Sequence, residues 1–162
     1  MVAWRNLMTG DARLGCGEVQ LPLLFTTEDT EDTENGGGGV ERDRLSHAVL
    51  GAAIAVHRTL GPGLLESVYA ACLCHELRAR AVPFERQVKV PVVYEGELMD
   101  AHFRVDLLVD SQLIVELKAV EYVLDVHRAQ LITYLKLTGI TRGLLINFNV
   151  LRLMDGVTRL VL

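Results

Sequence analysis

The chain has 162 residues, half of them hydrophobic, and a formal net charge of −5. This length and composition fit one domain with a full hydrophobic core. No apolar run approaches the ~20 residues that span a bilayer, and no basic-then-apolar segment typical of a secretory signal opens the chain, so we expect a soluble cytoplasmic protein with no membrane partner.

The charge is concentrated in the first 40 residues. They hold seven acidic and two basic side chains, whereas residues 41–162 hold fourteen of each and are neutral. A neutral domain lacks the basic surface of a tight binder of duplex DNA. The cysteines Cys16, Cys72 and Cys74 are odd in number and irregularly spaced, which fits a reducing compartment and argues against a disulfide framework.

Residues 1–40 are predicted to be a disordered N-terminal extension or linker. Residues 26–34 contain only threonine and acidic side chains, and Asn35 and four glycines follow. Such a segment has almost nothing to bury. The folded domain is therefore expected at residues 41–162.

Two helices are expected at the start of this domain. Apolar residues recur at helical spacing over residues 43–60. The Gly61-Pro62-Gly63 segment then breaks the helix, and a second helix is expected over residues 64–80, ended by Pro83.

From residue 84 the apolar residues alternate with polar ones, which predicts strands. A helix with Asp125 as its N-cap is expected between the third and the fourth strand. The predicted strands cover residues 88–92, 101–109, 112–120, 144–148 and 158–162. This order predicts an α/β fold in which helices flank a mixed sheet.

Two of these strands carry charge where a central hairpin should be buried. Glu116 and Lys118 are two residues apart, so they share one face of a strand, and Asp106 lies on the preceding strand. Burying such charges without partners costs several kcal/mol. The three residues therefore predict a metal site or a paired site, and the alternative is a surface hairpin in which Glu116 and Lys118 simply pair.

Asp106 followed by Glu116-x-Lys118 resembles the core motif of the PD-(D/E)XK nuclease superfamily. Gly63, Glu66 and Tyr69 form G-x-x-E-x-x-Y, the pattern that names the GxxExxY family of that superfamily. This resemblance implies a PD-(D/E)XK, or restriction-endonuclease-like, core.

Two later segments extend the resemblance. Gln130 and Tyr134 resemble the Gln-x-x-x-Tyr helix of many relatives, and residues 143–149 resemble the last core strand. The resemblance covers about residues 42–162 and leaves the N-terminal segment outside.

The resemblance assigns roles to the charged residues. Asp106 and Glu116 would bind Mg²⁺, with Mn²⁺ as an alternative, Lys118 would assist the attacking water, and Glu66 would complete the acidic cluster. Magnesium prefers oxygen ligands and keeps several waters, so two or three carboxylates suffice. For Glu66 the alternative is an ordinary first-turn glutamate stabilised by the helix dipole.

Three uncharged residues are expected to bind substrate or support the site. Gln130 and Tyr134 are four residues apart and share a helix face; the resemblance places this face beside the hairpin, and the alternative is a structural role at the rim of the core. Tyr69 is expected to be a structural aromatic whose hydroxyl reaches the site. The histidines lack the paired spacing of a zinc site.

The implied function is Mg²⁺-dependent hydrolysis of phosphodiester bonds in DNA or RNA, by endo- or exonucleolytic cleavage. The alternative is a nuclease-fold binding or assembly module without turnover, which the neutral charge of residues 41–162 favours. A homodimer is an open alternative to a monomer, because many minimal nucleases cleave two strands as a pair.

Overall fold

The structure, a computed structural model, describes residues 38–162. Its elements are α2 (Gly38–Leu60), α3 (Glu66–Ala79), β1 (Phe84–Tyr94), β2 (Glu97–Val109), β3 (Leu113–Lys118), α4 (Asp125–Thr138), β4 (Arg142–Asn147), the short 3₁₀ helix η1 (Leu153–Gly156) and β5 (Val157–Val161). None of the described helices is long and apolar enough to cross a membrane. The predicted disordered extension lies outside the described residues, except that α2 begins at Gly38, before the predicted start at residue 43.

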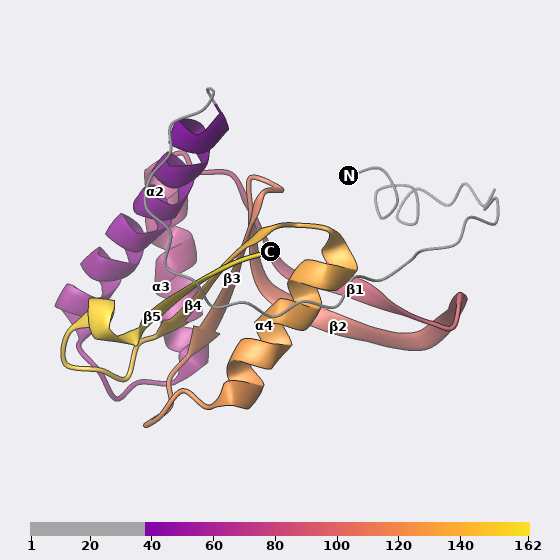
Figure 1. Ribbon diagram of the computed structural model, residues 1–162. Coiled ribbons are helices and arrows are strands. Elements are labelled where there is room, and N and C mark those ends of the chain that lie inside the picture. Colours follow the sequence, from indigo (N-terminus) through magenta and orange to yellow (C-terminus); the bar gives the residue numbers. More distant parts are fainter. Residues whose placement is uncertain (1–37) are drawn as a thin grey trace.

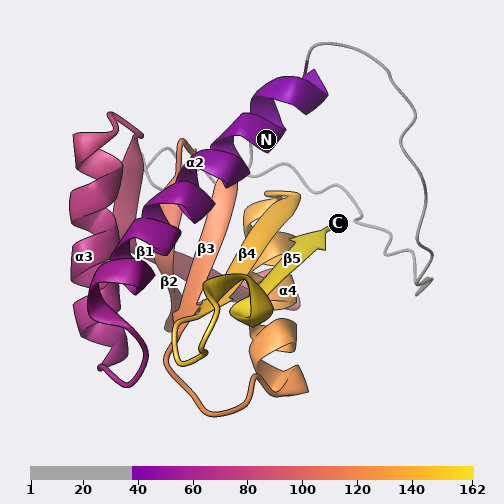
Figure 2. The same ribbon diagram turned by 90° about the vertical axis from the view of Figure 1, so that its left-hand side faces the viewer.

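The five strands form one mixed sheet in the order β1-β2-β3-β4-β5. β3 and β4 are parallel, and the other neighbouring pairs are antiparallel. Parallel neighbours require a crossover connection, and α4 provides it on one face of the sheet, while α2 and α3 cover the other face (Figures 1 and 2). The predicted α/β fold with flanking helices is confirmed.

Each face of the sheet has its own hydrophobic core. The core beneath α2 and α3 includes Val115 and Leu117 of β3, and the core beneath α4 includes Ile114. Residues 113–117 of β3 are all buried, as expected for a central strand covered on both faces. Glu116 lies in this buried run, on the same face as Ile114.

β1 and β2 are longer than predicted. They pair from Phe84–Val109 to Tyr94–Glu97, and their hairpin projects beyond the rest of the sheet (Figure 1). The projecting end does not pack into either hydrophobic core, and Tyr94 and Leu98 are therefore exposed there. The alternation of apolar and polar residues that predicts a strand therefore stops before the strand pairing does, and the predicted strands are too short.

The prediction of Asp125 as the N-cap of α4 is wrong. The N-cap is Leu124, whose backbone N–H donates a hydrogen bond to Nδ1 of His127 at 3.2 Å. The histidine at the third helical position thus accepts from the N-cap backbone, as in a capping box. Asp125 is the first residue of the helix, and its carboxylate pairs with Arg128 at 2.8 Å.

Aromatic rings join both helices of one layer to the segment after β4. The fully buried ring of Tyr69 on α3 stacks on Phe148, with centroids 4.4 Å apart and planes 13° apart. His57 near the end of α2 donates a hydrogen bond from Nε2 to the carbonyl of Val150 at 2.8 Å. These contacts fix α2 and α3 against the carboxyl end of β4.

Gly156 marks a close approach between η1 and β4. A Cβ at this position would lie 2.2 Å from the carbonyl oxygen of Asn147. We expect Gly156→Ala to lower the free energy of unfolding by about 2 kcal/mol or more, because backbone would have to move. Urea denaturation measures this change.

The matched control is Gly51→Ala within α2. Its new Cβ would meet only the flexible end of the Arg80 side chain, at 3.1 Å, and alanine favours a helix over glycine by up to about 1 kcal/mol. Equal losses of stability in both variants would contradict the close approach at Gly156.

Candidate active site

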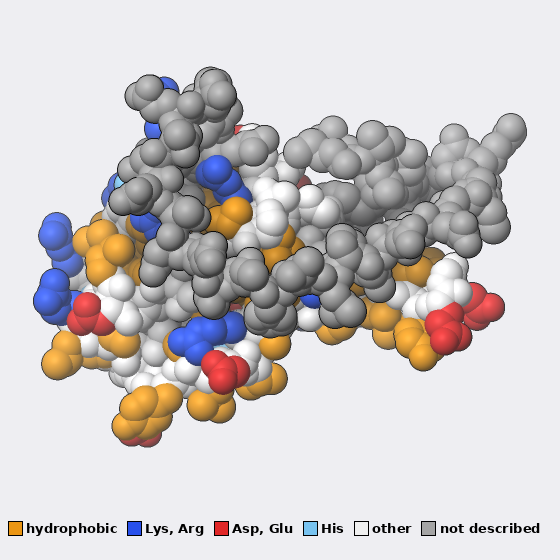
Figure 3. Space-filling view, viewed as in Figure 1, with side chains coloured by type: hydrophobic (Ala, Val, Ile, Leu, Met, Phe, Trp, Pro, Cys, Tyr) orange, Lys and Arg blue, Asp and Glu red, His pale blue; other side chains and the backbone are white. Residues whose placement is uncertain are grey.

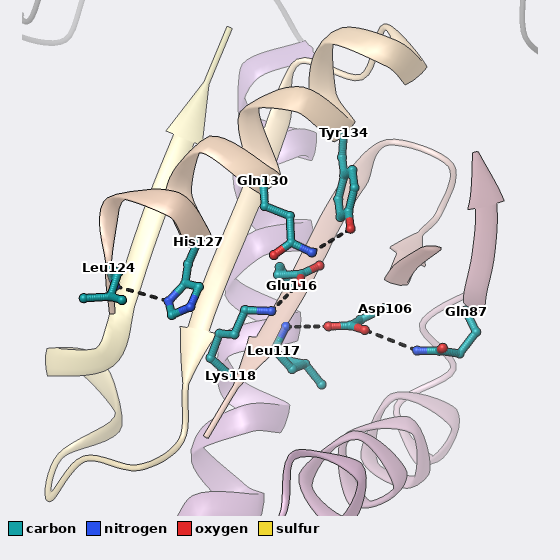
Figure 4. Close-up of polar contacts among 9 residues, drawn as sticks. All are labelled: Gln87, Asp106, Glu116, Leu117, Lys118, Leu124, His127, Gln130 and Tyr134. Carbon is teal, nitrogen blue, oxygen red and sulfur yellow. Dashed lines mark hydrogen bonds and ion pairs between the residues drawn. The ribbon is translucent and has the colours of Figure 1, made fainter. Parts of the chain in front are cut away.

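The two strands that carry the acidic motif separate at the site. β2 and β3 pair at Leu107–Val115, Leu108–Ile114 and Val109–Leu113, and the ladder stops there. At the next step, Oδ2 of Asp106 accepts a hydrogen bond from the backbone N–H of Leu117 at 2.9 Å (Figure 4). A side-chain carboxylate thus replaces a backbone carbonyl, and a fork opens between the strands.

Asp106 and Glu116 lie on the same face of this fork. They are the next pair in the register of the β2–β3 ladder, and paired residues of an antiparallel ladder point to one side. This face is the one covered by α4, and Figure 4 shows Asp106, Glu116 and Lys118 gathered beneath that helix. Both carboxylates therefore lie on the same face of the hairpin, as expected.

Glu116 and Lys118 form a buried ion pair. Nζ of Lys118 lies 2.6 Å from Oε1 of Glu116, and the glutamate side chain is 3% exposed. Its other oxygen, Oε2, is buried without a hydrogen-bond partner among the described residues. A buried carboxylate oxygen without a donor has lone pairs open to a water or a cation. Because both side chains are largely buried, the pair is not the surface contact of the alternative prediction.

Burial shifts the ionisation of the acidic cluster. Burial first, and then the negative charge of Asp106, raises the pKa of Glu116 from 4.5 to about 7, although Lys118 acts in the opposite direction. Burial also raises the pKa of Glu66, where Lys118 opposes and Asp106 adds to the shift. Repulsion between the carboxylates therefore contributes, but loss of hydration is the larger cause.

Lys118 stays protonated in this surrounding. Burial by itself would lower the pKa of its ammonium, but the hydrogen bond with Glu116 and the charges of Glu116, Glu66 and Asp106 raise the pKa overall. The site therefore combines three acidic groups with one fixed positive charge.

Glu66 is the first residue of α3. Tyr69, Ala70, Leu73 and Leu77 follow Glu66 at helical spacing and are buried, whereas Glu66 itself is half-buried. The charges of Lys118 and Asp106 act on the pKa of this carboxyl group in opposite directions.

The hydroxyl of Tyr69 is bonded to the loop before α3 rather than to the charged cluster. It donates to the carbonyl of Gly61 at 2.6 Å and accepts from the backbone N–H of Leu64 at 3.1 Å. Gly63, between these two residues, has a φ of +95° that favours glycine. Tyr69 thus closes the loop that leads into Glu66, the first residue of α3.

Gln130 and Tyr134 lie on the face of α4 that covers the fork (Figure 4). Nε2 of Gln130 donates a hydrogen bond to the Tyr134 hydroxyl at 2.6 Å. Burial raises the pKa of Tyr134, Gln130 opposes this shift, and the charges of Glu116 and Asp106 add to it. Both residues therefore lie beside the hairpin, as predicted.

Gln87 was not singled out by the sequence. It stands opposite Asp106 in the β1–β2 ladder, between the pairs Arg86–Leu107 and Val88–Val105. Its Nε2 donates to Oδ1 of Asp106 at 3.2 Å, and its φ of +54° is in the left-handed region. With Leu117 N–H on Oδ2, Gln87 fixes the orientation of the carboxylate; a lone glutamine in a strand gives no sequence signal for this.

The donor set suits a magnesium ion. No group of three or more His, Cys, Asp or Glu side chains within residues 38–162 forms a ready-made metal centre. Magnesium, however, is commonly held by one or two carboxylates and keeps its remaining waters. The oriented carboxylate of Asp106 and the unsatisfied Oε2 of Glu116 fit that requirement.

The strain at Gln87 can be measured. A left-handed residue other than glycine costs about 1 kcal/mol or more, and the exposed hydrogen bond to Asp106 that Gln87→Gly would lose contributes about 0.5 kcal/mol. We therefore expect Gln87→Gly to raise the free energy of unfolding by about 0.5 kcal/mol. Lys89→Gly, at an exposed β1 position without positive φ, is the matched control and should lower it by up to about 1 kcal/mol. The same sign in both variants would contradict the strain.

The raised pKa of Glu116 predicts the pH dependence of the metal-free protein. Because the folded state binds this proton more tightly, stability is fully present below pH 4.5 and is lost as pH rises to about 7. The loss should be about 3 kcal/mol. Denaturant melts in EDTA across this window should show it in the wild type but not in Glu116→Gln, and parallel profiles would overturn it.

The comparisons with known proteins agree with this geometry. The family model described as the PD-(D/E)XK nuclease superfamily matches residues 43–160. No curated protein and no solved structure matches the chain. The matched range includes every residue of the fork, of the first turn of α3 and of the Gln130–Tyr134 pair, and it spans most of the 162 residues. The chain therefore belongs to the PD-(D/E)XK nuclease superfamily.

Proposed function

We propose that this chain is a Mg²⁺-dependent nuclease of the GxxExxY family that hydrolyses phosphodiester bonds in nucleic acid. The observation that carries the proposal is the Glu116 carboxylate, buried in the central strand with Oε2 unsatisfied, beside Asp106 and the Lys118 ammonium. Burial of such a charged group lowers the stability of the folded protein, and a bound cation would offset that cost.

Asp106 and Glu116 would hold the cation, with Mn²⁺ as an alternative. When bound, the cation would lower the pKa of a water and offset charge on the phosphate. Binding a cation would also satisfy Oε2 of Glu116 and relieve the repulsion between Glu116 and Asp106.

The remaining residues act on the substrate. In hydrolysis the water oxygen bonds to phosphorus, the bond from phosphorus to the leaving sugar oxygen breaks, and that oxygen takes up a proton. The protonated Lys118 would stabilise the negative charge that grows on the phosphoryl oxygens. Glu66, half-buried at the start of α3, would position the water or accept its proton.

The alternative function is a binding or assembly module with a nuclease fold. The specific observation in its favour is the balance of fourteen acidic and fourteen basic residues over residues 41–162. Such a surface would attract a long polyanion only weakly. The oriented Asp106 and the buried Glu116–Lys118 pair favour hydrolysis, since a binding module has no need for them. A homodimer remains a prediction from the sequence.

Two substitutions separate metal binding from hydrolysis. Lys118→Ala should lower the rate of nicking by ~10²–10³ because it removes one positioned charge, while a Mg²⁺-dependent rise in melting temperature should persist. Asp106→Ala should abolish both. The assay should be run at a pH of about 8.5. Loss of Lys118 removes an interaction that lowers the pKa of Glu116, and the higher pH keeps that carboxylate ionised in the variant.

The control is Lys136→Ala, an exposed lysine in the last turn of α4, which should leave both measurements unchanged. If Lys118→Ala cleaves as fast as wild type, the assigned role of Lys118 is wrong. If wild type cleaves neither DNA nor RNA with Mg²⁺ or Mn²⁺ and instead retains a stable protein partner, the binding module is the correct function.

A further inference from the structure

Large hydrophobic side chains are exposed on the two segments that flank the charged cluster. We call this surface the apolar rim, and it consists of Leu64, Leu65, Val68, Tyr122, Leu124 and Val126. Leu65 is 74% exposed and immediately precedes Glu66, and Tyr122 is 71% exposed and follows Lys118 by four residues. The two halves of the rim are therefore neighbours, along the chain, of Glu66 and of Lys118.

The two halves of the rim lie at one end of the molecule. α3 and α4 both begin at the end of the sheet where β3 and β4 finish, as Figures 1 and 2 show from two directions. Figure 3 shows hydrophobic side chains protruding at this margin, below the start of α4. Carboxyl ends of parallel strands are where α/β sheets commonly bind ligands.

The loop that carries Tyr122 is held at both ends. The side chain of Asn147 pairs with Val120, because its Oδ1 accepts from the backbone N–H at 3.0 Å and its Nδ2 donates to the carbonyl at 2.9 Å. At the other end, Leu124 N–H is bound by His127. An exposed aromatic ring on a tethered loop loses little conformational freedom when it binds a ligand.

Two basic side chains near the rim in the sequence are already paired with acids. Lys118 is bound to Glu116, and Arg128 in the first turn of α4 is bound to Asp125. With an overall balance of acids and bases over residues 41–162, attraction to phosphates supplies little of the affinity expected here. Apolar and aromatic surface next to a phosphodiester site instead suits the faces of unpaired bases.

We propose that the apolar rim binds unpaired bases next to the scissile phosphate, with Tyr122 as a stacking platform, so that the site takes single-stranded nucleic acid. The proposal rests on the proposed function for the position of the phosphate. Bases inside a duplex offer only their edges, so a stacking ring selects strands whose bases are free. DNA and RNA present the same base faces, and both are expected to bind.

The test measures binding of a labelled thymidylate dodecamer by fluorescence anisotropy in EDTA, so that hydrolysis does not compete. An abasic dodecamer with the same phosphates, and the thymidylate paired in a duplex, should each bind about tenfold more weakly. Tyr122→Ala should weaken binding of the thymidylate about tenfold, the usual effect of one lost stacking contact, and should not change binding of the abasic strand. A uridylate dodecamer should behave as the thymidylate does.

The matched control is Tyr94→Ala, a tyrosine 64% exposed at the end of the projecting β1–β2 hairpin. It should bind as wild type does, and so should Tyr122→Phe, which keeps the ring. Equal binding of the abasic and thymidylate strands, or equal effects of Tyr122→Ala and Tyr94→Ala, would overturn the proposal. So would sedimentation that shows a dimer lost only in Tyr122→Ala, because a second copy would then cover the rim.

The outcome separates stacking from hydrolysis. If Tyr122→Ala loses base-dependent binding although wild type cleaves nothing with Mg²⁺, the rim is confirmed and the proposed nuclease activity fails. If wild type cleaves single strands and duplexes equally and Tyr122→Ala changes neither binding nor cleavage, the activity stands and the rim proposal is wrong.

Discussion

The arrangement of the site depends on the hydrogen bond from the backbone N–H of Leu117 to Oδ2 of Asp106. A buried N–H that leaves a sheet ladder must find another acceptor, and the Asp106 carboxylate supplies one at the point where β2 and β3 part. One contact thus ends the strand pairing without an unsatisfied donor, and it orients a candidate metal ligand. Gln87 completes the orientation from β1 on the other side.

The charged residues of the fork are costly to bury, and the fold compensates for that cost only in part. Glu116 has its ammonium partner on one oxygen and no donor on the other within the described residues. A buried carboxylate with only one oxygen paired lowers the stability of the folded protein. Stability and the proposed activity therefore oppose each other at Glu116, as is typical of functional sites.

The start of α3, which carries Glu66 as the third acidic residue, is held by contacts that involve no charge. Tyr69 stacks on Phe148, and its hydroxyl closes the Gly61–Leu64 loop, which leads into Glu66 at the first residue of α3. His57 holds the segment after Phe148 to α2. Within the G-x-x-E-x-x-Y segment, the glycine permits the turn, the tyrosine closes it, and the glutamate is the first residue of the helix that follows.

The sequence by itself determined the order of helices and strands, the mixed sheet, and the shared face of Glu116 and Lys118, because these follow from local periodicity and from the spacing of charges. Only the tertiary structure decided that Gln87 meets Asp106, that the Tyr69 hydroxyl serves a loop, that Leu124 caps α4, and that Glu116 keeps one oxygen unsatisfied. Each of these depends on where a side chain from one element meets another, and periodicity along a single segment carries no information about such distances.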